Sequence, residues 1–174
     1  EQRRAIAKDV VERTETEQLK PKMRVWVQSG DGQEVIDGVR EVDLQDVLHK
    51  GETCTVCALG GAICGLAHFE DNITLHKRFQ APGFGAVLIS VENRLELIFG
   101  DTQLALIEWT YEFGVGWYSL YCDTNTMEAA VEFFTHYKED PKERFLAIWR
   151  AIAAHPEGLF DPVEEVGKLD KMVS

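Results

Sequence analysis

The apolar segment at residues 52–68 reads Glu52-Thr53-Cys54-Thr55-Val56-Cys57-Ala58-Leu59-Gly60-Gly61-Ala62-Ile63-Cys64-Gly65-Leu66-Ala67-His68. When this segment is drawn as a helix, apolar side chains stand on every side, which is typical of a helix buried in a protein core. One face carries the small residues Ala58, Gly61 and Gly65, so a neighbouring helix could approach it closely. We therefore predict a central buried Cys/Gly-rich helix over residues 54–68, around which the rest of the chain packs.

The cysteines of this segment invite a zinc interpretation, and helix geometry argues against it. Cys54, Cys57, Cys64 and His68 share one face of the predicted helix, but they are spread over roughly 21 Å of its length. A zinc ion needs all of its ligand atoms within about 2.3 Å, and the chain has no second Cys-x-x-Cys motif. The motifs Gly83-Phe84-Gly85 and Gly114-Val115-Gly116 also lack the third glycine and the following helix of a dinucleotide-binding loop. We therefore expect no metal ion and no cofactor.

Three interpretations of the cysteines stay open. The first makes them small hydrophobic core residues, because free cysteine is among the most buried residue types. The second is a cysteine-dependent hydrolase or transferase, in which Cys57 (or Cys54) opens a buried helix as the nucleophile and His76 is the base. The third, a thioredoxin-like pair of Cys54 and Cys57, requires flanking βαβ units that the sequence does not show. We favour the first interpretation and expect no catalytic residue.

Composition predicts a folded acidic protein. The chain has 174 residues, of which 45% are hydrophobic, and its formal charge is −12. Residues 26–136 carry almost all of the acidic excess, so we expect no direct binding to nucleic acid, which needs a basic surface to replace the counterions of phosphate. The length predicts a single globular domain over residues 1–164. The polar stretch at 165–174 is expected to be a flexible C-terminal tail.

We expect neither a membrane span nor a signal peptide in this sequence. The longest uncharged run, residues 53–69, stands at the lower limit of about 17 residues for a membrane span and contains glycines and a histidine, so we expect no membrane segment. The charged first twenty residues lack the apolar region of a signal peptide. Cysteines in apolar runs predict reduced thiols in a cytoplasm.

The remaining periodicity predicts a mainly α (α+β) protein with a small antiparallel β element. Helices are indicated where apolar residues recur at helical spacing between capping signals such as Gly100, Asp101 and the Asp140-Pro141 pair. Strands are indicated where short apolar runs flank glycine-rich turns. The predicted helices cover residues 3–19, 92–99, 102–113, 127–138 and 141–152, and the predicted strands cover 23–28, 34–36 and 86–89.

Three segments of this chain resemble parts of small uncharacterised bacteriophage proteins. Residues 57–67 are similar to their Cys-x-Leu-Gly-x-x-x-Cys-type helix, residues 98–108 to a later helix, and residues 147–152 with 158–162 to their closing helix and turn. Ala58 stands where many of those proteins carry a second adjacent cysteine. The resemblance implies a phage or prophage origin and a place in the host cytoplasm, and it implies no activity.

These observations lead to one expected function and two alternatives. We expect a non-enzymatic phage accessory protein that binds a host protein, because no convergent catalytic set, metal site or phosphate loop is visible. The first alternative is the cysteine enzyme that uses Cys57 and His76. The second is a virion or assembly component. The oligomeric state and the identity of the partner are left open.

Overall fold

The structure is a computed structural model, and it describes residues 1–25, 27–29, 42–43, 48, 50–69, 74–75, 89–112, 128, 137 and 139–156. Several predicted features lie outside these residues. They are the strands at 34–36 and 86–88, nearly all of the helix at 127–138, the candidate base His76, and the proposed tail at 165–174.

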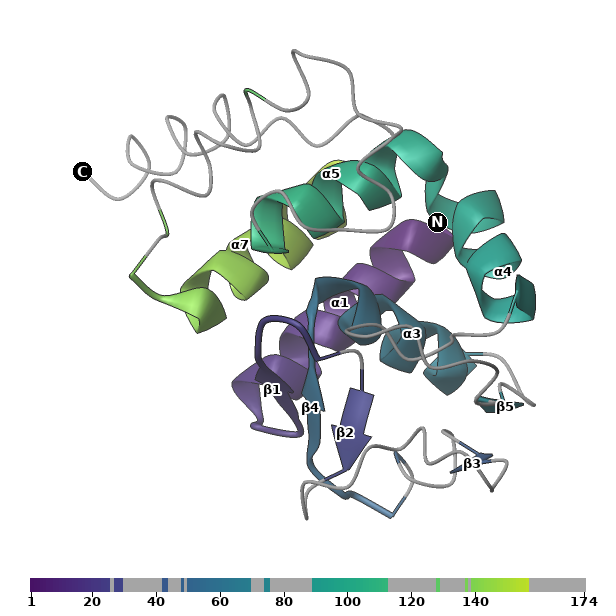
Figure 1. The fold of residues 1–174 in the computed structure, drawn as a ribbon, viewed down its shortest axis with the longest axis vertical. Helices are drawn as coiled ribbons and strands as arrows, with labels where there is room; N and C mark the ends of the chain where they lie inside the picture. The colour runs from purple at the N-terminus through teal and green to yellow at the C-terminus, as the bar shows by residue number, and fades with distance from the viewer. Residues whose placement is uncertain are drawn as a thin grey trace.

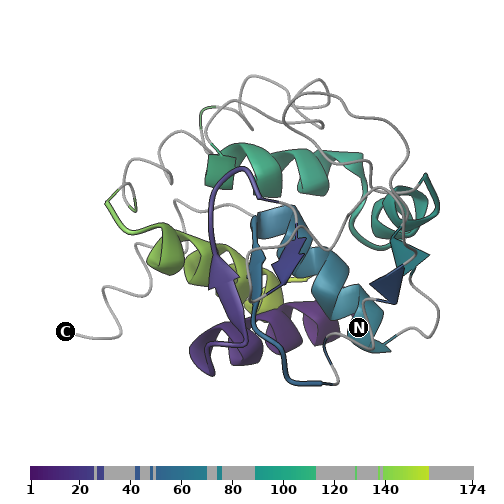
Figure 2. The same ribbon diagram turned by 60° about the horizontal axis from the view of Figure 1, so that its bottom comes forward.

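Helices dominate the described residues. They are α1 (Gln2–Glu15), α3 (Ala58–Phe69), α4 (Ile89–Phe99), α5 (Asp101–Glu112) and α7 (Pro141–Ala154). α3 lies in the middle: α1 packs along it on one side, and α4 and α5 contact it on another (Figure 1). Figure 2 shows α3 between α5 above and α1 below, with α7 beside α1. Ten of the twelve residues of α3 are buried, so this helix is the centre of the core.

Strands form two small sheets. β1 (Leu19–Pro21), β4 (Cys54–Val56) and β2 (Val27–Ser29) make a three-stranded sheet with β4 in the middle. β2 pairs with β4 antiparallel, and β1 adds a parallel pairing on the other edge. β3 (Val42–Asp43) and β5 (Thr74–Leu75) form a two-stranded antiparallel sheet. A mainly helical fold with a small β element is thus confirmed.

The predicted start of the central helix is wrong. Cys54, Thr55 and Val56 form the strand β4, and the helix begins only at Ala58. Cys54 and Val56 are buried while Thr55 is partly exposed, which is the alternation of a strand rather than of a helix. β4 pairs with a strand on each side. These backbone hydrogen bonds stabilise residues 54–56 as a strand more than an extension of α3 would stabilise them as a helix. Ile89, predicted to close a strand, instead begins α4.

The small residues of α3 have the predicted role. An added Cβ at Gly61 would lie 2.7 Å from Cζ of Phe145 on α7, and one at Gly65 would lie 2.8 Å from Cγ2 of Ile6 on α1. Both distances are shorter than carbon atoms tolerate, so α1 lies against α3, and the Phe145 ring of α7 reaches α3, only because these positions carry no side chain. The middle of α3 is fully buried as a result.

The predicted stop of α4 and the predicted cap of α7 are also present, whereas Asp101, predicted to cap α5, is the first residue of that helix. Gly100 has φ +77°, the left-handed conformation that favours glycine, at the junction of α4 and α5. The Asp140 carboxylate accepts hydrogen bonds from the backbone N–H of Lys142 at 2.9 Å and of Glu143 at 3.1 Å, and Pro141 occupies the first turn of α7. Local sequence signals therefore place both helix boundaries correctly.

Replacing Asp140 with alanine is expected to lower the free energy of unfolding by about 1 kcal/mol, because two backbone donors of α7 lose their acceptor. Asp140→Ser should recover most of the loss, since its hydroxyl also accepts from this turn. Urea denaturation of the three proteins measures the difference. Equal stability of the wild type and Asp140→Ala would show that this cap contributes nothing.

Candidate functional site

The structure divides the four residues of the predicted cysteine face among β4, α3 and the residue between them. Cys54 begins β4, Cys57 follows β4, and Cys64 lies on α3; all three cysteines are buried. His68 stays in the last turn of α3, with its ring near Asp9 and Arg13 of α1. Among the described residues, no group of three or more His, Cys, Asp or Glu side chains is arranged to hold a metal ion.

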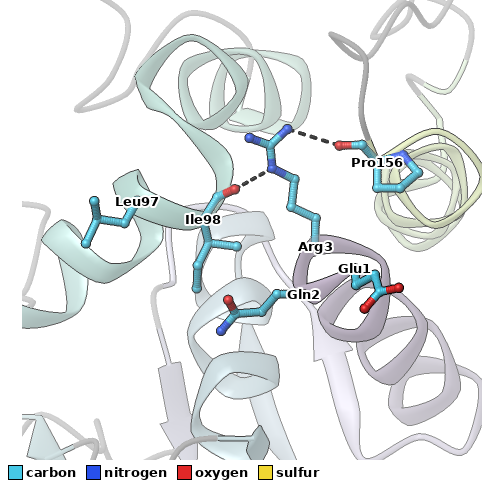
Figure 3. Close-up of a pocket in the computed structure, with 6 residues that line it drawn as sticks. All are labelled: Glu1, Gln2, Arg3, Leu97, Ile98 and Pro156. Atoms are coloured by element: carbon cyan, nitrogen blue, oxygen red, sulfur yellow. Dashed lines mark hydrogen bonds between the residues drawn. The ribbon is translucent and has the colours of Figure 1, made fainter.

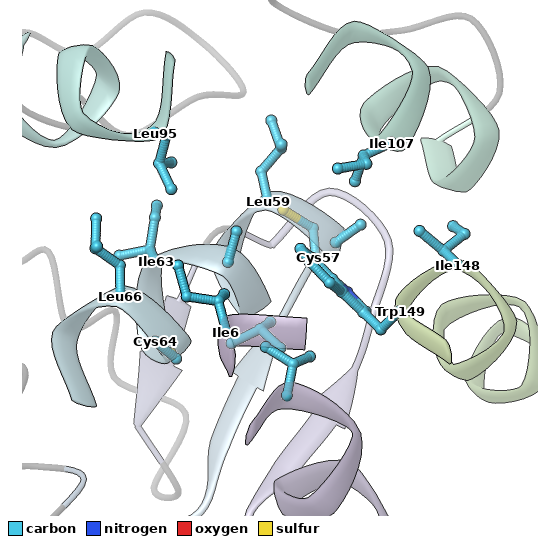
Figure 4. Close-up of a cluster of buried hydrophobic side chains, with 14 of the residues drawn as sticks. Ile6, Cys57, Leu59, Ile63, Cys64, Leu66, Leu95, Ile107, Ile148 and Trp149 are labelled. Atoms are coloured by element: carbon cyan, nitrogen blue, oxygen red, sulfur yellow. The ribbon is translucent and has the colours of Figure 1, made fainter. Parts of the chain in front are cut away.

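Cys57 is a core residue. Only 7% of it is exposed, and Figure 4 shows it inside the buried apolar cluster, near Leu59 and Trp149. Its backbone N–H donates to the Val25 carbonyl, and its sulfur accepts the backbone N–H of Gly60 at 3.4 Å. Burial raises the pKa of the Cys57 thiol to about 12, and the hydrogen bond from Gly60 only partly opposes this effect. The thiol is therefore protonated at neutral pH and is a poor nucleophile.

A group of polar side chains is buried next to Cys57, which we call the buried polar cluster. It consists of Glu108, Tyr111 and Glu112 on α5 together with Arg144 in the first turns of α7. All four are at most 6% exposed. The Arg144 guanidinium lies over the Tyr111 ring, 5.2 Å from its centre, and also donates to the Tyr137 carbonyl at 3.1 Å. Two carboxyl groups and one guanidinium thus share a small volume of the interior.

Glu112 joins this cluster to the connection between β1 and β2. Both of its carboxyl oxygens lie 3.0 Å from the backbone N–H of Arg24, which donates to them. Arg24 has φ +60°, an uncommon value for a residue other than glycine, and the contact with Glu112 helps to hold it. Burial, with a smaller contribution from the charge of Glu108, raises the pKa of the Glu112 carboxyl to about 7, against the hydrogen bond from Arg24. Near neutral pH this carboxyl therefore exists in both protonation states.

Sequence reasoning missed the buried polar cluster. One signal was nevertheless present: two acidic residues at i and i+4 repel each other, and the C-terminal turn of a helix disfavours negative charge. This unfavourable placement of two carboxyl groups marks positions that tertiary contacts must stabilise.

The described surface has a hollow of about 210 Å³ where the start of α1 meets the ends of α4 and α7. Figure 3 shows Arg3 crossing it and donating to the carbonyls of Ile98 and Pro156, the second at 3.0 Å. Leu97 stands at its edge and is 85% exposed. The remaining residues that line the hollow are Glu1 and Gln2.

Comparison with known proteins adds no assignment: no protein-family model, no curated protein and no solved structure matches this chain. The candidate pair of Cys57 and His76 stays a prediction, because His76 lies outside the described residues. None of the helices that the structure describes combines the length and the hydropathy of a transmembrane span.

Proposed function

We propose that this protein is a phage-type accessory protein that acts in the host cytoplasm by binding a host protein rather than by catalysis. The observation that carries the proposal is the exposed Leu97 at the edge of the hollow between α1, α4 and α7. An apolar side chain beside a preformed hollow is the arrangement in which a few anchor residues supply most of the binding energy of a protein interface.

The rim of this hollow is held in place before a partner arrives. Arg3 donates to backbone carbonyls at the ends of α4 and α7, and Arg4 donates to the Ala153 carbonyl at 3.1 Å. These contacts connect three helices, so little conformational entropy is lost when a partner side chain enters. The chain also carries a net charge of −12, which favours a protein partner over nucleic acid.

The burial of Cys57 and the raised pKa of its thiol favour a binding function over the cysteine-enzyme alternative. A nucleophilic cysteine needs a thiolate, which a lowered pKa or an adjacent base supplies. Cys57 instead has a raised pKa and lies in the apolar core beside two carboxyl groups, which oppose a further negative charge. The hydrolase hypothesis would require this thiol to become accessible and to lose its proton.

Leu97→Asp is expected to weaken binding of the host partner between tenfold and a hundredfold, since burial of one leucine contributes about 1.5–3 kcal/mol. A photo-crosslinking residue placed at position 97 would first identify the partner in host lysate. Titration calorimetry with the purified partner then compares the wild type with Leu97→Asp.

Phe69→Ser is the matched control, because Phe69 is 50% exposed but does not line the hollow. This variant should bind the partner like the wild type, and both variants should keep the wild-type circular dichroism spectrum. Equal affinities of Leu97→Asp and the wild type would contradict the proposed surface. The absence of any host protein that binds would contradict the proposed function itself.

A further inference from the structure

The connection between β1 and β2 carries a thioether that contacts a buried cation. Met23 lies in this connection, two residues after the end of β1, and packs partly buried against the hydrophobic core. Nη2 of Arg144, near the start of α7, donates to the Met23 sulfur at 3.3 Å. Arg144 is only 1% exposed, so this contact joins the connection to α7 from inside the protein.

A thioether is a weak partner for such a donor. The guanidinium is permanently charged and has only donors, whereas a thioether sulfur accepts hydrogen bonds weakly. Hydrogen bonds from a charged donor to an oxygen atom are shorter and roughly twice as strong as those between neutral groups. Nη1 of Arg144 already donates to an oxygen, the Tyr137 carbonyl, at 3.1 Å. An oxygen atom added to the Met23 sulfur would offer Nη2 an acceptor of comparable strength.

The backbone beside Met23 is held in place. The N–H of the next residue, Arg24, donates to both carboxyl oxygens of Glu112, at 3.0 Å each. The Met23 side chain, by contrast, is unbranched and has three rotatable bonds, so the sulfur can shift locally while the backbone stays fixed. An added oxygen could therefore turn toward Arg144 without a rearrangement of the connection.

We propose that Met23 is a modification site, which hydrogen peroxide oxidises to the sulfoxide, and that Arg144 then donates to the sulfoxide oxygen. The sulfur lone pair attacks one peroxide oxygen, so that an S–O bond forms while the O–O bond breaks. The other oxygen takes the proton of the transferred oxygen and leaves as water. The sulfur loses two electrons and the peroxide gains them, so the step needs no other reactant.

The buried guanidinium reverses the usual effect of this modification on stability. A sulfoxide in an apolar core buries a polar oxygen that has no donor, which disrupts packing. At Met23 the Arg144 guanidinium supplies the donor, so oxidation should tighten the contact between the β1–β2 connection and α7. Met23 does not line the hollow between α1, α4 and α7, so this site would operate whether or not a partner occupies the hollow.

The site is located by peroxide treatment of the folded full-length protein at neutral pH. A protease that cuts after glutamate releases residues 18–34, which contain Met23 and neither of the other two methionines. Tandem mass spectrometry should find one added oxygen atom on Met23 rather than on Trp26. Folded protein whose Met23 stays unoxidised, under conditions that oxidise Met23 in urea-unfolded protein, would overturn the proposal.

The effect on stability is measured in the double variant Met127→Leu/Met172→Leu, in which Met23 is the only methionine. After peroxide treatment, dithiothreitol restores reversibly oxidised cysteines. The oxidised protein should then unfold at a higher urea concentration than the untreated protein, because Arg144 has gained a stronger acceptor. An equal or lower midpoint of unfolding would overturn the proposal.

Two substitutions test the acceptor without any oxidant. Met23→Gln places an amide oxygen near the expected position of the sulfoxide oxygen, so it should raise the urea midpoint as oxidation does. Met23→Leu has a similar volume but no acceptor, so it should lower the midpoint. A Met23→Gln protein that is no more stable than Met23→Leu would overturn the proposal.

The matched control removes the donor and keeps the thioether. In Arg144→Leu, oxidation of Met23 should lower the urea midpoint, because the sulfoxide oxygen has lost the guanidinium. A rise equal to that of the wild-type contact would show that Arg144 does not hold the oxygen. The two Met23 variants decide the same question if Arg144→Leu does not fold.

Discussion

Gly65→Val is expected to lower the free energy of unfolding by about 3 kcal/mol, because α1 leaves no room for a side chain at this position of α3. A Cβ there would lie 2.8 Å from Cγ2 of Ile6, 3.2 Å from Cγ2 of Val10 and 3.3 Å from the Ile6 carbonyl oxygen. The backbone contact cannot be relieved by rotating a side chain, so the helices must move apart. Urea denaturation of the wild type and the variant measures the loss.

A smaller substitution and a second-site change test the cause. Gly65→Ala should cost less, since alanine adds one methyl group and also favours the helix. Removing the opposing side chain in the double variant Ile6→Ala/Gly65→Ala should cost less than the sum of the two single changes. Strict additivity, or a Gly65→Val protein as stable as the wild type, would mean that α1 does not approach α3 as closely as the structure shows.

The second large effect is a dependence of stability on pH that arises from Glu112. Burial raises the pKa of this carboxyl to about 7, above its ordinary value of 4.5. The folded protein therefore holds the proton at pH values where the unfolded chain has already released it. The stabilisation is complete below the ordinary pKa and disappears as the pH rises through 7, a total change of about 3 kcal/mol.

Glu112→Gln removes the titration and should flatten this part of the stability profile. The amide cannot accept both hydrogen bonds from Arg24, so the variant is expected to start from a lower stability in acid and to lose less of it toward alkaline pH. Glu139→Gln serves as the control, because Glu139 is exposed and its loss should leave the profile unchanged. The measurement is the free energy of unfolding in urea across this pH range. Parallel profiles for the wild type and Glu112→Gln would contradict the assignment.

Local signals predicted helix ends well. Gly100 and Asp140 act through their own backbone conformation and their immediate neighbours. A few consecutive residues are therefore enough to predict where these helices end or begin. The small face of α3 was also predictable, since helical spacing alone brings Gly61 and Gly65 together. The residues that pack against this face could not be predicted, because Ile6 and Phe145 are distant from it in the sequence.

Tertiary contacts decided the remaining features. Cys54 belongs to a strand because β1 and β2 supply partners on both sides, which the apolar run around it does not reveal. The buried polar cluster combines Glu112 with the backbone of Arg24 and the side chain of Arg144, and no spacing in the sequence connects these three residues. The candidate binding hollow likewise joins the first residues of the chain to the ends of α4 and α7.

The reactivity of Cys57 in the native protein tests the central claim most directly, namely that this thiol belongs to the interior and performs no chemistry. Iodoacetamide is added at neutral pH to native protein and to protein unfolded in urea, and tandem mass spectrometry follows the label at Cys57. The account predicts that Cys57 is alkylated at least about a thousandfold more slowly in the native protein than in the unfolded protein, because the reagent reaches the thiol only when the core opens. Alkylation of native Cys57 as fast as in the unfolded chain would contradict it.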